Sequence, residues 1–223
     1  MQYLTRESSI QAIGNITALF DDIRGTYSRH GIDLGNDVGR QNILLSAAQE
    51  HFFARAIASV VGRCTNDGRT GAADILIDSL DNREVECKVL SKSKTGAWQF
   101  QADKASLIRK GSSDFLYLMF NRSYTEVGVF LFETLTPDDF KEPSPGARGK
   151  SRLNKQTAFK KCTPIIGSFS DKRIFYMNKY EAELKSAKTE HAKEKAAQKL
   201  ELWYNKPSCY SIQLESLNEI KNK

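Results

Sequence analysis

Two strongly apolar segments near the middle of the chain limit what it can fold into. Residues 114–121 have the sequence DFLYLMFN and residues 127–134 have the sequence VGVFLFET, and the turn-like Arg122-Ser123-Tyr124 separates them. Apolar runs of this length that are rich in aromatic residues are typical of buried strands. We therefore expect both segments to be central strands of one sheet.

A second pair of strands is predicted between Gly71 and Leu90. Asp74 precedes the apolar run 75–77, a turn signal follows at Asp81-Asn82, and a second strand is expected over 85–90. Side chains alternate between the two faces of a strand. This alternation separates a polar set (Glu84, Glu86, Lys88) from an apolar set (Val85, Cys87, Val89).

Segments with helical spacing precede and follow this hairpin. One helix is predicted over 8–27, with Ser8 or Ser9 as its N-cap, and a glycine-rich loop over 25–39. A second helix is predicted from about Asp37 to about Val60, and a third over 98–110. The buried stripe predicted for the second helix is Leu44, Leu45, Ala48, Phe52 and Ala56. The predicted fold class is α/β, with a central mixed β-sheet flanked by helices.

The C-terminal part is predicted to be mainly helical. A short strand is expected over 174–177, followed by a long exposed helix over 180–204 that is rich in Ala, Glu, Lys and Leu. This long C-terminal helix is expected to project as an arm or to pair with a second subunit. Pro207 ends it, and an edge strand is expected over 210–214.

The polar face of the predicted hairpin carries groups suited to metal-dependent phosphodiester cleavage. Mg²⁺ prefers hard oxygen ligands and usually takes one or two protein carboxylates, with waters and phosphate oxygens in its other positions. Asp74 and Glu86 supply two carboxylates, and we expect the carbonyl of Cys87 to help. Lys88 lies on the same face, where a lysine can orient the attacking water and stabilise charge that develops on phosphorus.

The arrangement Asp74…Glu86-Cys87-Lys88 resembles the motif of the PD-(D/E)XK nuclease superfamily, which includes most type II restriction endonucleases. Ala73 stands where the family motif has proline, and the likeness covers the hairpin and its flanking elements. The resemblance implies a restriction endonuclease-like core and Mg²⁺-dependent cleavage of double-stranded DNA, with one or two ions per active site. It also implies a homodimer that cuts a palindromic site to leave 5′-phosphate ends, and a cognate DNA methyltransferase.

The resemblance extends to two residues on the predicted helices. It makes Glu50, on the helix before the hairpin, a further candidate metal ligand. Some family members place a glutamine near the metal from the helix after the hairpin, where Gln101 is expected; the alternative for Gln101 is an ordinary surface residue. The alternative for Glu50 is a rim glutamate paired with Arg55 or another base.

Positive charge is concentrated in one segment. The chain has a formal net charge of +6 and a pI of about 9.1, which fits a polyanionic partner. Residues 141–161 contain seven basic side chains and a single acidic one, Glu142. Lysine and arginine bind phosphates, while arginine, asparagine and glutamine can pair with base edges, so we expect this segment to bind DNA; the alternative is a solvated loop. The predicted DNA contacts are Lys92, Lys94, Gln101, Lys104, Arg148, Lys150, Arg152, Asn154, Lys155, Gln156, Lys160 and Lys161.

The 223 residues are expected to form one domain. Its expected parts are N-terminal helices (1–60), a catalytic core (61–140), the basic segment (141–172) and a helical arm (173–223). No apolar run approaches the roughly 20 residues that span a bilayer, and the N-terminus lacks a signal-peptide apolar region, so a cytoplasmic protein is expected. The sequence contains neither a Cys-x-x-Cys pair typical of zinc sites nor the Gly-x-x-x-x-Gly-Lys-Ser/Thr loop of ATP-driven enzymes.

Two other functions remain open from the sequence. The first is a repair or recombination nuclease of the same fold, which would recognise DNA structure and ignore base sequence. The second is a non-catalytic DNA-binding protein, in which Glu86 and Lys88 form a surface salt bridge. It would bind DNA in a salt-dependent manner and yield no metal-dependent products.

Overall fold

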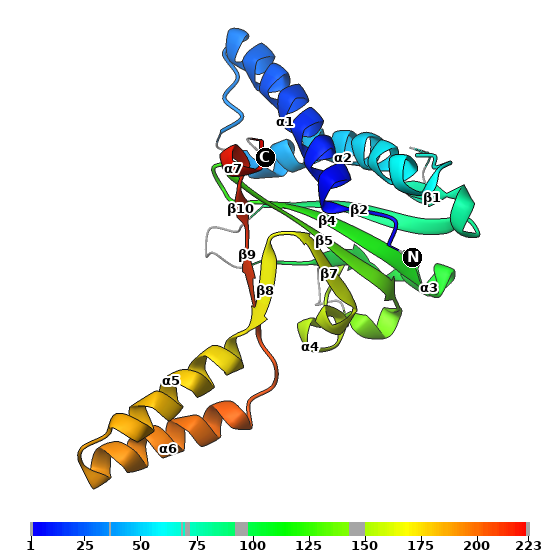
Figure 1. Cartoon of the computed structure of the whole chain (residues 1–223). Coiled ribbons are helices and arrows are strands. Elements are labelled where there is room, and N and C mark those ends of the chain that lie inside the picture. Colours follow the sequence, from blue (N-terminus) through cyan, green and yellow to red (C-terminus); the bar gives the residue numbers. More distant parts are fainter. Residues whose placement is uncertain are drawn as a thin grey trace.

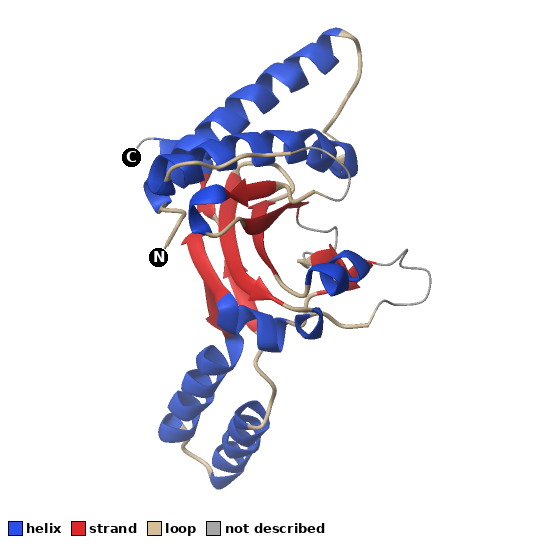
Figure 2. Ribbon diagram, turned by 90° about the vertical axis from the view of Figure 1, so that its right-hand side faces the viewer, coloured by secondary structure: helices blue, strands red, loops and turns tan. Residues whose placement is uncertain are grey.

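A mixed β-sheet lies at the centre of the protein, with helices on both faces (Figures 1 and 2). The computed structural model describes residues 2–35, 37–67, 69, 72–91, 98–142 and 150–221. The strand order is β1-β2-β4-β5-β10, and β7 also pairs with β5. The strands are β1 (Ile75–Ile77), β2 (Arg83–Ser91), β4 (Ser113–Phe120), β5 (Glu126–Leu135), β7 (Cys162–Ile166) and β10 (Glu215–Ser216). The predicted class, a mixed sheet flanked by helices, is confirmed, as are the two central strands and the hairpin before them.

Strands β2 and β4 form the one parallel pair among the described strands, and this pairing explains the chain path between them. Parallel neighbours need a crossover connection, and this one contains β3 (Gln101–Asp103) and α3 (Lys104–Lys110). The helix predicted over 98–110 is therefore correct only from Lys104 onwards. Residues 101–103 are extended because they pair antiparallel with β6 (Lys150–Arg152), far along the chain.

Helices α1 (Arg6–Arg29) and α2 (Val38–Val61) cover one face of the sheet (Figure 1). The predicted cap of the first helix is wrong, because Thr5 accepts a hydrogen bond from the Ser8 amide and forms the N-cap. The helix also continues to Arg29, so the predicted glycine-rich loop is shorter. Asp37 caps α2 close to the expected start.

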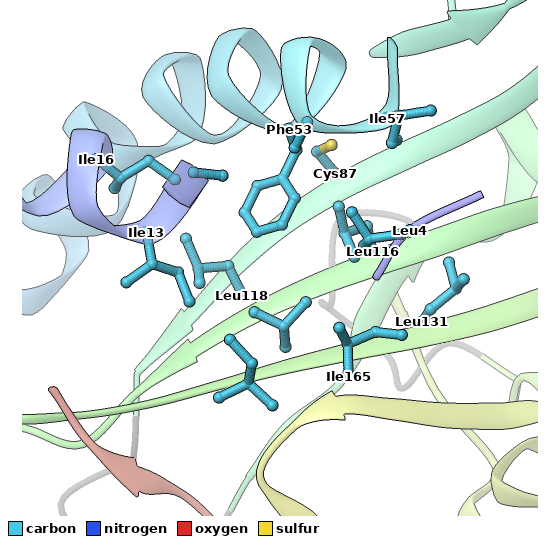
Figure 3. Packing of buried hydrophobic residues seen from close by; sticks show 14 of the residues in the cluster. Leu4, Ile13, Ile16, Phe53, Ile57, Cys87, Leu116, Leu118, Leu131 and Ile165 are labelled. Carbon is cyan, nitrogen blue, oxygen red and sulfur yellow. The ribbon is translucent and has the colours of Figure 1, made fainter. Parts of the chain in front are cut away.

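The buried stripe of α2 is rotated from the predicted one. Leu44 and Phe52 are only partly buried, whereas Phe53 and Ile57 are fully buried. Figure 3 shows Phe53 and Ile57 packing toward the sheet near Cys87. This rotation of α2 matters for the candidate site, because Glu50 of α2 lines the same pocket as Asp74 and Glu86.

Both faces of β4 are buried, which explains its unbroken apolar sequence. One set of alternate residues (Leu116, Leu118, Phe120) packs with α1 and α2 in the first core. The other set (Phe115, Tyr117, Met119) packs in a second core with aromatic residues from β5, from the position just before β3 and from the segment after β6 (Phe130, Phe132, Phe100, Phe159). This second core includes Leu107 of α3 and Ala158 of α4 (Lys155–Ala158), so it fixes the crossover to the sheet.

A helical hairpin projects from this body as an arm (Figures 1 and 2). It consists of α5 (Lys172–Ser186) and α6 (Glu190–Tyr204), and a small sheet of β8 (Ser168–Asp171) and β9 (Tyr210–Gln213) lies at its base. The predicted strand over 174–177 is wrong, because Asp171 caps α5 and the segment is helical. The predicted single helix over 180–204 is wrong too, because the chain turns before Thr189, which caps α6. The edge strand expected over 210–214 is confirmed.

The last described element is the short helix α7 (Leu217–Lys221). Within the described ranges, no helix combines the length and the apolar character needed to cross a membrane.

Candidate active site

The hairpin register brings Asp74 next to Glu86. Ile75 pairs with Val85 across the antiparallel strands, so Asp74, immediately before β1, lies beside Glu86. The hairpin closes through Asp81 and Asn82, whose φ angles are 52° and 58°. Asp and Asn tolerate this left-handed conformation better than most residues, so the turn residues fix the register that forms the site.

Lys88 joins the two carboxylates. Its Nζ atom lies 3.2 Å from Asp74 Oδ2 and 3.2 Å from Glu86 Oε2, and donates to the Cys87 carbonyl oxygen at 2.8 Å. The Cys87 amide donates to Asp74 Oδ2 at 2.7 Å, which fixes that carboxylate to the backbone of β2. The three predicted catalytic residues are thus brought together, along with the predicted carbonyl.

A second lysine, Lys110, approaches the same cluster from α3. Its Nζ lies 2.6 Å from Glu86 Oε1 and 2.8 Å from Glu84 Oε2. Lys110 is not among the site residues predicted from the sequence, because only the crossover between the parallel strands β2 and β4 brings α3 against β2. The basic pair Arg109-Lys110 at the end of this short helix is the sequence feature that could have pointed to a role for Lys110.

A pocket of about 330 Å³ is lined by Asp74, Glu86, Lys88 and Lys110. Glu50 of α2 is among its lining residues, so the helix before the hairpin contributes to the site. No ion pair joins Glu50 to Arg55 in the part of the chain that the structure describes. The other lining residues are Asp67, Arg69, Ala72, Asp103, Ser106, Leu107, Ser113 and Phe115.

The electrostatics of the pocket favour ionised side chains at its centre. Burial alone would raise the pKa of Glu86, but the ammonium groups of Lys88 and Lys110 hold it below its usual value. Burial would lower the pKa of Lys88, but Asp74 and Glu86 more than offset this and raise it. Burial, and then the charge of Asp74, raises the pKa of Glu50. Glu50 is therefore more ready to hold a proton than an ordinary exposed glutamate.

The oxygen atoms around Lys88 are of the kind that binds a hard cation. No group of three or more His, Cys, Asp or Glu side chains suited to metal binding occurs among the described residues. The oxygen atoms around Lys88 do not form such a group, because only two come from carboxylate side chains and the third is a backbone carbonyl. Mg²⁺ takes such oxygens and completes its coordination with water and phosphate. The chemistry of these donors would therefore suit a divalent cation.

Six of the predicted DNA contacts lie together in a separate hollow of about 740 Å³. They are Gln101, Lys150, Arg152, Asn154, Lys155 and Gln156. Gln101 lies on β3, not on the predicted helix, and it is not among the residues that line the pocket around Glu86. The cause is the pairing of β3 with β6, which carries Gln101 to the basic segment.

Three other predicted contacts that the structure describes do not line this hollow. Lys104 forms a close ion pair with Glu142, and Lys161 Nζ lies 2.7 Å from Asp139 Oδ2. Lys160 is exposed beside Lys161. The predictions for Lys92, Lys94 and Arg148 fall outside the described residues.

No protein-family model matches the chain, and no curated protein matches its sequence.

Proposed function

We propose that this protein is a magnesium-dependent endonuclease that hydrolyses phosphodiester bonds at specific sites in double-stranded DNA. The observation that carries the proposal is the contact of one ammonium group, that of Lys88, with Asp74, Glu86 and the Cys87 carbonyl. An acid pair, a carbonyl and a lysine at the wall of a polar pocket match the requirements of hydrolytic phosphoryl transfer. The proposed fold is a restriction endonuclease-like core.

The order of elements supports this core. Helix α2 is followed by the antiparallel β1–β2 hairpin, a crossover with α3, and the pair β4–β5, of which β4 is parallel to β2. The acidic residues lie on the hairpin, and the helix before it supplies Glu50. Each of these features matches the family that the Asp74…Glu86-Cys87-Lys88 motif resembles.

Asp74, Glu86 and the Cys87 carbonyl would hold Mg²⁺ in the proposed reaction. When bound, the ion would neutralise charge on the scissile phosphate and lower the pKa of a water molecule. Lys88 would move to donate to the attacking water and to a phosphate oxygen, so that the water lies in line with the leaving group. Attack of the water oxygen on phosphorus breaks the bond to the 3′ oxygen, which takes up a proton, and leaves a 5′-phosphate end.

Glu50 of α2 and Lys110 of α3, which both line the pocket, would assist this chemistry. Glu50, whose pKa is raised, would exchange a proton with solvent water near the metal site. Lys110 would keep the Glu86 carboxylate in one orientation through its 2.6 Å contact. The proposal includes a homodimer, because one such site cuts one strand at a time, and a cognate methyltransferase that protects the host.

The test is cleavage of a long DNA of mixed sequence by the purified full-length protein. Wild type is incubated with magnesium and, separately, with EDTA, beside Lys88→Ala and the control Lys193→Ala, which removes an exposed ion pair with Glu190 on the arm. We expect discrete fragments with 5′-phosphate ends from wild type and Lys193→Ala with magnesium only.

Other outcomes would point to the alternatives. Cleavage confined to branched or end-containing DNA would favour a structure-specific nuclease. DNA binding without products under any divalent metal would overturn the catalytic proposal and leave a DNA-binding protein.

A further inference from the structure

The two-stranded ribbon β3–β6 presents an amide and a guanidinium group side by side. Gln101 pairs directly with Arg152 across the antiparallel ribbon. The central pair, Ala102 and Ser151, is buried, at 4% and 0% exposure. Because side chains alternate along a strand, Gln101 and Arg152 lie on the opposite, outward face.

Around this pair the surface is basic and rich in amide side chains. Gln99, Asn154 and Gln156 line the 740 Å³ hollow with the ribbon. Asn154 Oδ1 accepts the Gln156 amide as the cap of α4, which leaves its Nδ2 group to donate. The hollow therefore combines hydrogen-bond donors and acceptors with positive charge.

The cations of this hollow differ from the other basic side chains of the segment. Lys104 and Lys161 are held in ion pairs, whereas no carboxylate partner is found for Lys141, Lys150 or Arg152 within the described ranges. Burial, followed by the charges of Lys172 and Lys141, lowers the pKa of Lys155 in the same hollow. Positive charge that is not neutralised by the protein is available to phosphates.

We propose that the outward face of the β3–β6 ribbon reads base edges in the DNA major groove; this inference rests on the proposed function. The major groove admits a two-stranded β-ribbon. Arg152 has the geometry to bond O6 and N7 of a guanine, and Gln101 to bond N6 and N7 of an adenine. Lys141 and Lys150, beside them, contact phosphates and set the register of the ribbon on the duplex.

The position of the ribbon also limits where the read bases lie. Helix α3 follows β3 directly, and its last residue, Lys110, contacts Glu86. Three strand residues span about 10 Å and seven helical residues about 10 Å, so the path from Gln101 to Lys110 is at most about 20 Å, or roughly six base pairs at about 3.4 Å each. The bases read by Gln101 and Arg152 therefore lie within about six base pairs of the bond that is cut.

The experiment is selection of bound DNA from a random duplex pool, with cleavage disabled by Lys88→Ala in the full-length chain. Arg152→Ala, Arg152→Lys, Gln101→Ala and Lys150→Ala are each added to this background, and melting temperatures check that each variant is folded. Sequencing of the bound pools gives the base preference at each position.

We expect the Lys88→Ala pool to be enriched in one short sequence. Arg152→Ala and Arg152→Lys should each lower the preference for one guanine by about 10- to 100-fold, because a lysine cannot form the bidentate pair. Gln101→Ala should do the same at one adenine. Lys150→Ala should weaken binding to all sequences alike and reduce the slope of log K against log salt by about one.

The inference is overturned if the ribbon variants keep the base preference of the Lys88→Ala protein. It is also overturned if the Lys88→Ala protein itself shows no base preference. These results can be separated from failure of the proposed function. A protein that never cleaves, but whose base preference depends on Arg152, keeps the ribbon assignment and loses the catalytic one. If wild type cleaves at a fixed site but the ribbon variants keep the same base preference, the catalytic assignment stands and the ribbon assignment is lost.

Discussion

Lys110 Nζ lies 2.6 Å from Glu86 Oε1, so the end of α3 is tied to the middle of β2. Lys88 approaches the other oxygen of the same carboxylate at 3.2 Å. Glu86 is therefore held from both sides by cations that come from different elements. A carboxylate held in this way keeps one orientation toward the pocket, which is the property a metal ligand needs.

Replacing Lys110 by methionine tests this positioning role. We expect the cleavage rate at saturating magnesium to fall by about 10- to 100-fold, as is typical for loss of a group that orients a metal ligand. The magnesium concentration that gives half the maximal rate should fall as well, because one competing cation beside Glu86 is removed. Rates measured across a magnesium titration check both effects. An unchanged maximal rate would show that Lys110 does not position Glu86.

The hydroxyl of Tyr3 is predicted to contribute to stability through Asp114. Tyr3 donates to Asp114 Oδ2 at 2.7 Å, and Arg83 Nε lies 2.5 Å from the same oxygen. Both Tyr3 and Asp114 are buried, and burial followed by the charge of Asp114 raises the pKa of Tyr3, so the hydroxyl remains a donor. Tyr3→Phe should lower the free energy of unfolding by about 1–3 kcal/mol. Urea unfolding should show a lower midpoint at an unchanged slope; an unchanged midpoint would contradict the prediction.

Stability should depend on acid pH through Asp139. Burial alone would raise the pKa of this carboxyl, but Lys161 and the Thr136 amide hold it below its usual value. The folded-state pKa is then below the unfolded value of about 3.9. The stabilisation is fully present above the unfolded pKa and is lost as the pH falls through the folded pKa.

The comparison is between wild type and Asp139→Asn. Their difference in unfolding free energy should be constant from about pH 5 to pH 7 and should shrink below about pH 4. Urea unfolding at each pH measures it. In a Lys161→Met background the difference should be smaller throughout, since the main partner of the carboxylate is gone. A difference that grows as the pH falls would contradict the assignment.

The arm is predicted to open without unfolding of the sheet. Trp203 of α6 stacks on Tyr176 of α5 with ring centroids 4.1 Å apart, and Ala196 is the only fully buried residue of the two helices. An aromatic pair of this kind contributes about 0.5–1.5 kcal/mol beyond area burial. Trp203→Ala should therefore expose the arm to trypsin and leave the main thermal transition in place. Tyr204→Ala, which removes a side chain that is 70% exposed, is the control and should change neither.

The parts of the fold that follow from local chemistry could be predicted from the sequence. The β1–β2 hairpin has its turn residues and its alternation within one short segment, so Asp74, Glu86 and Lys88 could be placed together. The central strands are apolar on both faces and need no partner information to be recognised. Helix α2 begins at an Asp that caps it.

The features that could not be predicted from the sequence depend on contacts between distant segments. Gln101 is extended because it pairs with Arg152, and Lys110 reaches Glu86 through a crossover whose geometry follows from the parallel β2–β4 pair. The apolar run at 174–177 has strand composition, yet it is helical because Asp171 caps it and Tyr176 packs on Trp203. Tertiary packing overrides local preference at each of these places.

The most direct test of the proposed catalytic site compares the single-turnover cleavage rate of Asp74→Asn with that of Glu215→Gln. Both substitutions remove the charge of a partly buried, ion-paired carboxylate, but Glu215 pairs with Arg6 away from the pocket. With magnesium and a fixed DNA fragment, Asp74→Asn should lose at least about 10²- to 10³-fold in rate. Glu215→Gln should cleave at the wild-type rate, and EDTA should stop all cleavage. Equal rates for Asp74→Asn and wild type would contradict the assignment of the hairpin pocket as the catalytic site.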